Sequence, residues 1–266
     1  MFGQLLHHVG LWPIFAVSAV VLYGVTQVGL VLGRHMRLRL DQPTQAQVTT
    51  IATSLLGLLA LLLGFAFAMA VNRFESRRMV AIEEVDAIRT AYARSQLLAP
   101  EHRDSAARML RDYVDARIEH LRAGEDDASI TAAERRADAI LDSLWADAVT
   151  IAQVTSDEVR TGFYVSSLND IISDHARRAA SMENQVPEII LWLLYLVAFA
   201  ALGMMGYACG FGNGRHTLVR GVLVLTVAAT IHVVIDLDRP RSGSILVNER
   251  HLTDLQAGMR VGDALP

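Results

Sequence analysis

Four long apolar blocks restrict this chain to an integral membrane fold. They are residues 11–32, 51–71, 189–208 and 218–235. Each block has about 20 residues, and a helix of that length crosses a hydrocarbon core of about 30 Å. The first three contain no charged side chain, whereas the fourth has Arg220 near its start. We therefore predict an all-α integral membrane protein with four transmembrane helices.

The first block is expected to stay in the protein as a helix. No Arg or Lys precedes it, and no small-residue cleavage site follows at a short distance. It is also too long for the apolar region of a signal peptide.

The polar region at residues 72–186 predicts an antiparallel helical bundle inserted between the second and third membrane helices. Its apolar residues recur at helical spacing, and Pro100 marks one helix boundary. Two patterns of the capping-box type, at Thr131–Glu134 and Thr155–Glu158, predict helix starts because hydroxyl and carboxylate each satisfy a free N–H. No breaker follows Val71, so we expect the second membrane helix to continue into the bundle.

The chain is thus expected to have four parts. They are an N-terminal membrane hairpin at 1–71, the bundle at 72–186, a C-terminal membrane hairpin at 187–238 and a tail at 239–266.

The arginine distribution favours a cytoplasmic bundle. Nine arginines lie near the membrane on the side of the bundle, and five lie in or near the two short loops. Cytoplasmic flanks carry the excess of basic residues. Arg34, Arg37 and Arg39, which follow the first helix, favour the opposite orientation when taken alone.

Composition and motifs argue against an enzyme. All 24 basic residues are arginines, which excludes a lysine Schiff base and a P-loop lysine. The single cysteine, Cys209, excludes a disulfide framework. A net charge of −4 provides no basic field for nucleic acid. We expect no catalytic residues, no metal, no cofactor and no nucleic-acid partner.

Two acidic pairs are interpreted as structural. Glu83 and Glu84 are adjacent on a helix, so their side chains diverge by about 100° and do not converge on one substrate atom. Asp236 and Asp238 have the spacing of a short metal-binding motif, but they lie at a helix end near the interface.

The second membrane helix carries small residues on one face, which has two interpretations. Small faces let helices approach closely in lipid, which predicts a close helix contact at Gly64. Alternatively, the face lines a pore whose mouth is polar and whose apolar constriction gates by dewetting. The pore-lining candidates are Thr50, Ser54, Gly57, Leu61, Gly64, Phe65 and Ala68.

The third and fourth membrane helices each carry one further signal. Gly206 and Gly210, four residues apart in the third helix, predict close helix packing. His232, near the end of the fourth helix, is a candidate functional group because ionisable side chains are costly in a membrane. At the interface the same side chain can instead be solvated.

Several motifs together resemble a known bacterial family. They are LGFAFAMA at 63–70, RFESRR at 73–78, EVDAI at 84–88, TAYAR at 90–94, LLAP at 97–100 and DLDRPRSGSI at 236–245. This combination resembles the bestrophin-like domain family, a set of bacterial membrane proteins of unassigned function. The chain departs from the family pattern at Arg241, where phenylalanine is usual, and at Val85, where a small residue is usual.

The resemblance implies a distant similarity to bestrophins, which are oligomeric anion channels with four membrane helices per subunit. It implies a homo-oligomer, a pentamer by analogy, in the bacterial inner membrane. Inorganic ions would be the transported species, and the second helix would line the central axis. The alternative is a membrane-anchored scaffold or sensor whose helical domain binds a partner.

The last motif is interpreted as a structural clasp. It begins where the fourth helix leaves the membrane, and Pro240 prevents a simple helical continuation. The clasp residues are Asp236, Asp238, Arg239 and Gly243. We expect Arg239 and Arg241 to pair with Glu83 or Glu84.

Overall fold

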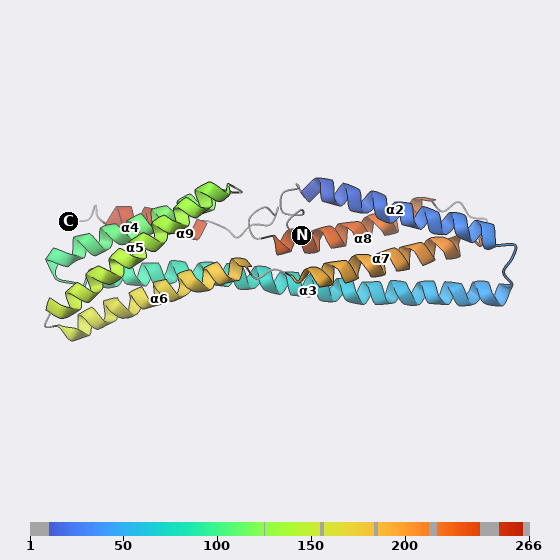
Figure 1. The fold of residues 1–266 in the computed structure, drawn as a ribbon. Coiled ribbons are helices and arrows are strands. Elements are labelled where there is room, and N and C mark those ends of the chain that lie inside the picture. Colours follow the sequence, from blue (N-terminus) through green and yellow to red (C-terminus); the bar gives the residue numbers. More distant parts are fainter. Residues whose placement is uncertain are drawn as a thin grey trace. The chain divides into compact units, whose positions relative to one another are not determined.

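The computed structural model describes residues 11–124, 126–154, 157–183, 186–212, 217–239 and 250–262, and within these ranges it is helical without strands (Figure 1). The helices are α2 (Leu11–Met36), α3 (Gln42–Ser95), α4 (Pro100–Arg122), α5 (Asp127–Val154), α6 (Glu158–Glu183), α7 (Glu188–Cys209), α8 (Thr217–Asp238) and α9 (Arg250–Gly262). Four of them, α2, α3, α7 and α8, are long and apolar enough to cross a membrane. The predicted all-α membrane fold is confirmed.

The chain divides into two compact units. The membrane unit comprises Met1–Phe74 and Gln185–Ile245, and the helical unit comprises Glu75–Asn184 and Leu246–Pro266. Helix α3 runs through the boundary, so the expected continuation of the second membrane helix past Val71 is confirmed. Its 54 residues give a length of about 80 Å, far more than a bilayer core requires, and the excess builds the helical unit.

In the membrane unit, α2 packs along α7 and also contacts α8 (Figure 1). A Cβ atom added to Gly206 would overlap the carbonyl oxygen of Thr26, and one added to Gly33 would overlap that of Tyr207. A Cβ atom on Gly210 would lie 2.7 Å from the Cα of Gly33. Only glycine permits this approach of the two backbones, which confirms the close packing predicted from Gly206 and Gly210.

Helix α3 contributes one narrow face to the core of the membrane unit. Leu59, Ala66 and Ala70 on this face are almost completely buried. Their spacing of seven and four residues places them on one side of the helix. Leucines beside this face, such as Leu55 and Leu62, are half-buried against the same core, and the opposite side of the helix is exposed.

In the helical unit, α4 packs against α5 and α5 packs against α6, as expected for helices joined by short connections (Figure 1). The core is apolar and draws on every helix of the unit. Its fully buried members include Ile88, Leu110, Leu144, Ile151, Leu168 and Ile171.

Two helix starts differ from the predicted capping boxes. Helix α5 begins at Asp127, and the Asp126 carboxylate caps it by accepting the backbone N–H of Ser129 at 3.3 Å. Thr131 therefore lies inside the helix, where its hydroxyl donates to the carbonyl oxygen of Asp127, and the predicted cap at Thr131 is wrong. In α6, Asp157 accepts the N–H of Arg160 at 3.1 Å and takes the capping role. Thr155 lies outside the described residues.

Helix α9 was not expected from the sequence, which suggested only a tail. Its Leu252, Leu255 and Met259 enter the core of the helical unit. The Tyr92 hydroxyl donates to the carbonyl oxygen of Met259 at 3.1 Å, which fastens α9 to α3. The tail is thus a structural part of the helical unit.

Candidate functional site

All seven candidate pore-lining residues of α3 are exposed in the single chain. They are Thr50, Ser54, Gly57, Leu61, Gly64, Phe65 and Ala68. They lie on the side of the helix opposite the buried face at Leu59 and Ala66, and the Phe65 side chain is 67% exposed. The face is therefore free to meet lipid, a second copy of the chain or water.

The close helix contact predicted at Gly64 is wrong within the chain. No atom of another element lies within 4 Å of a Cβ built on Gly64 or on Gly57. The reason is the orientation of α3 about its axis. The side of α3 that carries Ala66 and Ala70 faces the other helices of the chain, so the side that carries Gly64 faces away from them. A contact of Gly64 with another subunit stays a prediction.

The first residues of this face are polar, and their hydroxyl groups donate hydrogen bonds within α3 itself. The Thr50 hydroxyl donates to the carbonyl oxygen of Ala46 and the Ser54 hydroxyl to that of Thr50, each at 3.0 Å. Each hydroxyl oxygen still has lone pairs to offer outward. This region can therefore be wetted, whereas the stretch from Gly57 to Ala68 offers mainly apolar atoms.

His232 lies against aromatic rings of α2. Its ring centroid is 5.2 Å from that of Phe15 and 6.0 Å from that of Trp12. Within the described ranges, its buried Nδ1 atom has no hydrogen-bond partner. The three rings connect the end of α8 to the first turn of α2, and a functional role of His232 stays a prediction.

The clasp motif joins the end of α8 to the start of α7. Oδ1 of Asp238 accepts the backbone N–H of Val186 at 2.8 Å, and Val186 directly precedes the proline that caps α7. Asp236 and Arg239 are buried beside it, and the Arg239 N–H donates to the carbonyl oxygen of Asp236. Gly243 and Arg241 lie outside the described residues.

Glu83 and Glu84 pair with arginines of the helical unit. Arg177 lies 3.4 Å from Glu83, and both groups are about half exposed. Glu84 is 1% exposed and is held by Arg117 on α4 and Arg178 on α6. The expected pairing of Glu83 or Glu84 with Arg239 stays a prediction, and the one with Arg241 falls on a residue outside the described ranges.

Glu84 is the centre of a buried polar cluster. Its Oε1 atom accepts from Arg117 Nε at 2.8 Å and from the Tyr113 hydroxyl at 2.8 Å. Its Oε2 atom lies 3.3 Å from Arg178 Nε and 3.4 Å from Arg117 Nη2. His175 Nδ1 contacts the Tyr113 hydroxyl at 2.9 Å, which extends the cluster within α6.

The charge state of Glu84 follows from its neighbours. Glu84 lies in the helical unit, 13 residues beyond the last apolar residue of the membrane part of α3. Burial alone would raise the pKa of its carboxyl group, but Arg117 and Arg178 outweigh burial and lower that pKa to about 2. The carboxylate therefore stays ionised at any physiological pH and accepts hydrogen bonds without donating one.

A second side chain of the cluster, His175, connects α6 to α5. Its Nε2 atom lies 3.0 Å from Asp138 Oδ1. Burial lowers the pKa of His175, although Glu84 and Asp138 oppose that shift.

This cluster was not predicted from the sequence, although one signal for it was present. Arg117 stands on a helical stripe with Leu110, Val114 and Leu121, and an arginine among such residues indicates a buried charge that needs a partner. Arg178 carries no such signal, because its burial depends on how α6 packs.

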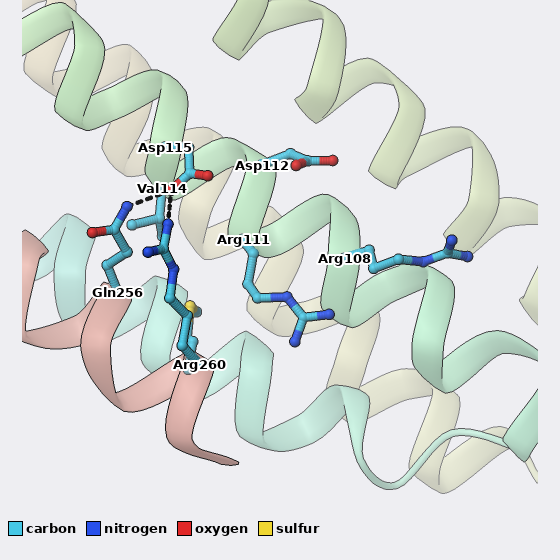
Figure 2. A pocket seen from close by; sticks show the side chains of 8 residues that line it. Arg108, Arg111, Asp112, Val114, Asp115, Gln256 and Arg260 are labelled. Atoms are coloured by element: carbon cyan, nitrogen blue, oxygen red, sulfur yellow. Dashed lines mark hydrogen bonds and ion pairs between the residues drawn. The ribbon is translucent and has the colours of Figure 1, made fainter. Parts of the chain in front are cut away.

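A pocket of the helical unit lies between α4 and α9 and has a volume of about 410 Å³. Figure 2 shows Asp115 of α4 facing α9, where Gln256 donates to it at 2.5 Å and Arg260 approaches to 3.8 Å. Arg108 and Arg111 extend from the same side of α4. The contacts of Asp115 explain how α9 is held at its polar edge.

Neither pocket nor cluster in the described ranges has the composition of a metal site. No three His, Cys, Asp or Glu side chains there lie close enough together to hold a metal ion.

Comparison with known proteins agrees with the resemblance drawn from the motifs. Residues 19–252 match the bestrophin-like domain family. The crystal structure of a bacterial bestrophin homologue from Klebsiella pneumoniae, a point variant, has a TM-score of 0.69 at 14% identity, covering 92% of this chain and 99% of that chain. The crystal structure of a membrane protein has a TM-score of 0.65 at 14% identity, covering 93% of this chain and 96% of that chain. None of the curated proteins matches the chain.

Proposed function

Because the chain belongs to the bestrophin-like domain family, we propose that it forms a homo-oligomeric ion channel in which α3 lines the central axis. The observation that carries this proposal is the uncovered face of α3 between Thr50 and Ala68. Of the four membrane helices, α3 buries the smallest share of its apolar span, 17% against 39% for α8. Copies of the chain arranged around an axis would place this face inward.

The chemistry of the face suits a pore with two sections. The hydroxyls of Thr50 and Ser54 form a wettable entrance, since their oxygens can still accept hydrogen bonds. Farther along, Leu61 and Phe65 are exposed and apolar, and a ring of such side chains can close a pore by dewetting. Gly57 and Gly64 leave room for the helices of neighbouring subunits to approach.

The membrane part of α3 carries no charged side chain, so the face itself provides no fixed charge to select an ion. By analogy with bestrophins, we propose that the channel conducts anions and that the oligomer is a pentamer. The excess of arginines on the side of the helical unit supports a cytoplasmic position for that unit in a bacterial inner membrane.

A flux assay tests the proposal directly. Purified protein is reconstituted in liposomes, and chloride, nitrate, potassium and sodium fluxes are compared. Conduction of at least one of these ions is expected. A protein that assembles in liposomes yet passes none of them would contradict the channel and favour a scaffold or sensor.

Cysteine modification then tests the assignment of α3. In a Cys209→Ala background, Leu61→Cys and Phe65→Cys are expected to make flux sensitive to a charged thiol reagent. Val20→Cys on α2, whose side chain is also exposed, is the matched control and should be insensitive. Block at Val20 without block at Leu61 or Phe65 would place the axis elsewhere.

A further inference from the structure

The helical unit contains a small cavity whose charged end has more arginine than carboxylate. The cavity has a volume of about 60 Å³ and is bordered by Arg77, Glu84, Arg117 and Arg178. Arg78 and His251 also line the cavity, and its other lining residues are apolar and include Leu252 of α9. A cavity holds a water molecule once it offers about 10–15 Å³, so this one has room for a small ion.

The Glu84 carboxylate has no free acceptor position left for further N–H groups of the two arginines. Arg117 Nε and the Tyr113 hydroxyl occupy Oε1, while Arg117 Nη2 and Arg178 share Oε2. The Nη1 atom of Arg117 is buried and has no hydrogen-bond partner among the described residues. Arg178 Nε lies within ion-pair distance of Glu84 but outside hydrogen-bond geometry.

The charges in this cluster do not balance. Arg117 is 1% exposed and Arg178 is 4% exposed, and Glu84 is the one comparably buried carboxylate that either contacts in the described ranges. The carboxylates of Asp138 and Glu134 are 61% and 42% exposed, so water screens them. In these contacts two buried guanidinium groups face one buried carboxylate, so about one unit of positive charge is left over. Arg77, which also lines the cavity, has contacts of its own.

Water alone does not resolve this imbalance. It can accept the free N–H groups of Arg117, but an uncompensated buried charge still carries a large desolvation cost. An anion satisfies both requirements, because it accepts hydrogen bonds and cancels the charge. A monovalent anion matches the single excess charge, and the apolar walls favour one that sheds its hydration easily.

We propose that this cavity binds one small monovalent inorganic anion, such as a halide or nitrate, against Arg117 and Arg178. The bound anion stabilises the helical unit and the packing of α9 in it, since Leu252 of α9 lines the cavity. This site lies within the helical unit of each chain, so it does not depend on whether the protein conducts ions.

Thermal unfolding of the purified full-length protein in detergent tests the site. Sodium chloride, bromide and nitrate are titrated against sodium gluconate at constant ionic strength, because gluconate is too large to enter. We expect a saturable rise in the unfolding midpoint on the order of 5 °C at high chloride. An equal midpoint in chloride and gluconate would overturn the proposal.

Two variants separate this site from other effects of salt. Arg178→Met removes the excess charge and keeps the Arg117–Glu84 pair, and Ala81→Leu fills the cavity without changing a charge. Each is expected to lose the chloride-dependent shift. Ala93→Leu, at an exposed position of the same helix, is the matched control and should keep it.

If Arg178→Met and Ala81→Leu shift as the wild type does, the halide binds elsewhere and the proposal is wrong. Crystals grown in bromide provide a direct measurement, with an anomalous peak expected beside Arg117 Nη1. A carboxylate of a neighbouring copy at that position would equally refute a bound anion.

Discussion

Replacing Glu84 by glutamine is expected to destabilise the helical unit by about 3 kcal/mol and to reduce its sensitivity to acid. Arg117 and Arg178 lower the pKa of Glu84 from 4.5 to about 2 against the opposing effect of burial. A shift of about 2.5 units at 1.36 kcal/mol per unit corresponds to about 3 kcal/mol. Removing one member of a buried ion pair costs about 3–5 kcal/mol in other proteins, which is the same range.

The pH dependence has a definite sign. Between the two pKa values the unfolded chain binds a proton at Glu84 and the folded chain does not, so stability rises with pH in this window. The contribution of Glu84 is complete above pH 4.5 and is lost as the pH falls from there toward about 2. Glu84→Gln should therefore be less stable near pH 7 and should lose less of its remaining stability on acidification.

Denaturant unfolding of the purified protein, followed by circular dichroism, measures both effects, with sodium gluconate as the salt so that no small anion occupies the cavity. Asp86→Asn is the matched control, because the Asp86–Arg89 pair on the same helix is more than half exposed and should contribute less than about 1 kcal/mol. A Glu84→Gln protein with wild-type stability and wild-type acid sensitivity would refute the reasoning.

A double-mutant cycle measures the interaction free energy between Glu84 and Arg117. Arg117→Met alone leaves Glu84 with Arg178, and Glu84→Gln alone leaves two buried guanidinium groups. The double variant is expected to be more stable than the sum of the two single effects allows, since it buries fewer unpaired charges. Additive effects would mean that Glu84 and Arg117 do not stabilise each other.

Three further substitutions test the membrane unit. Gly206→Ala should lower stability by about 1–3 kcal/mol through overlap with α2, whereas Gly221→Ala, which has open space, should be nearly neutral in the same thermal assay. Asp238→Ala should cost about 1–3 kcal/mol because the Val186 N–H loses its acceptor, and wild-type thermal stability would contradict the clasp. Gly64→Leu should reduce the oligomer fraction in size-exclusion chromatography, and an unchanged oligomer would show that this face does not mediate assembly.

The sequence by itself determined the four membrane helices, the inserted helical region and the continuation of α3 past Val71. These features depend on the length of apolar blocks and on the spacing of residues along one segment, and both can be read locally. Gly206 and Gly210 are a further local signal, because close helix packing requires small residues at regular spacing within a single helix.

Only the tertiary structure decided which side of each helix packs against the rest of the chain. A membrane helix is apolar all round, so nothing within α3 indicates that Ala66 faces its own chain and Gly64 does not. The partners of Glu84 come from α4 and α6, and the docking of α9 depends on Tyr92 and Asp115 in helices remote from it in sequence. Burial and ion pairing arise from contacts between distant segments, and those contacts exist only once the helices have packed.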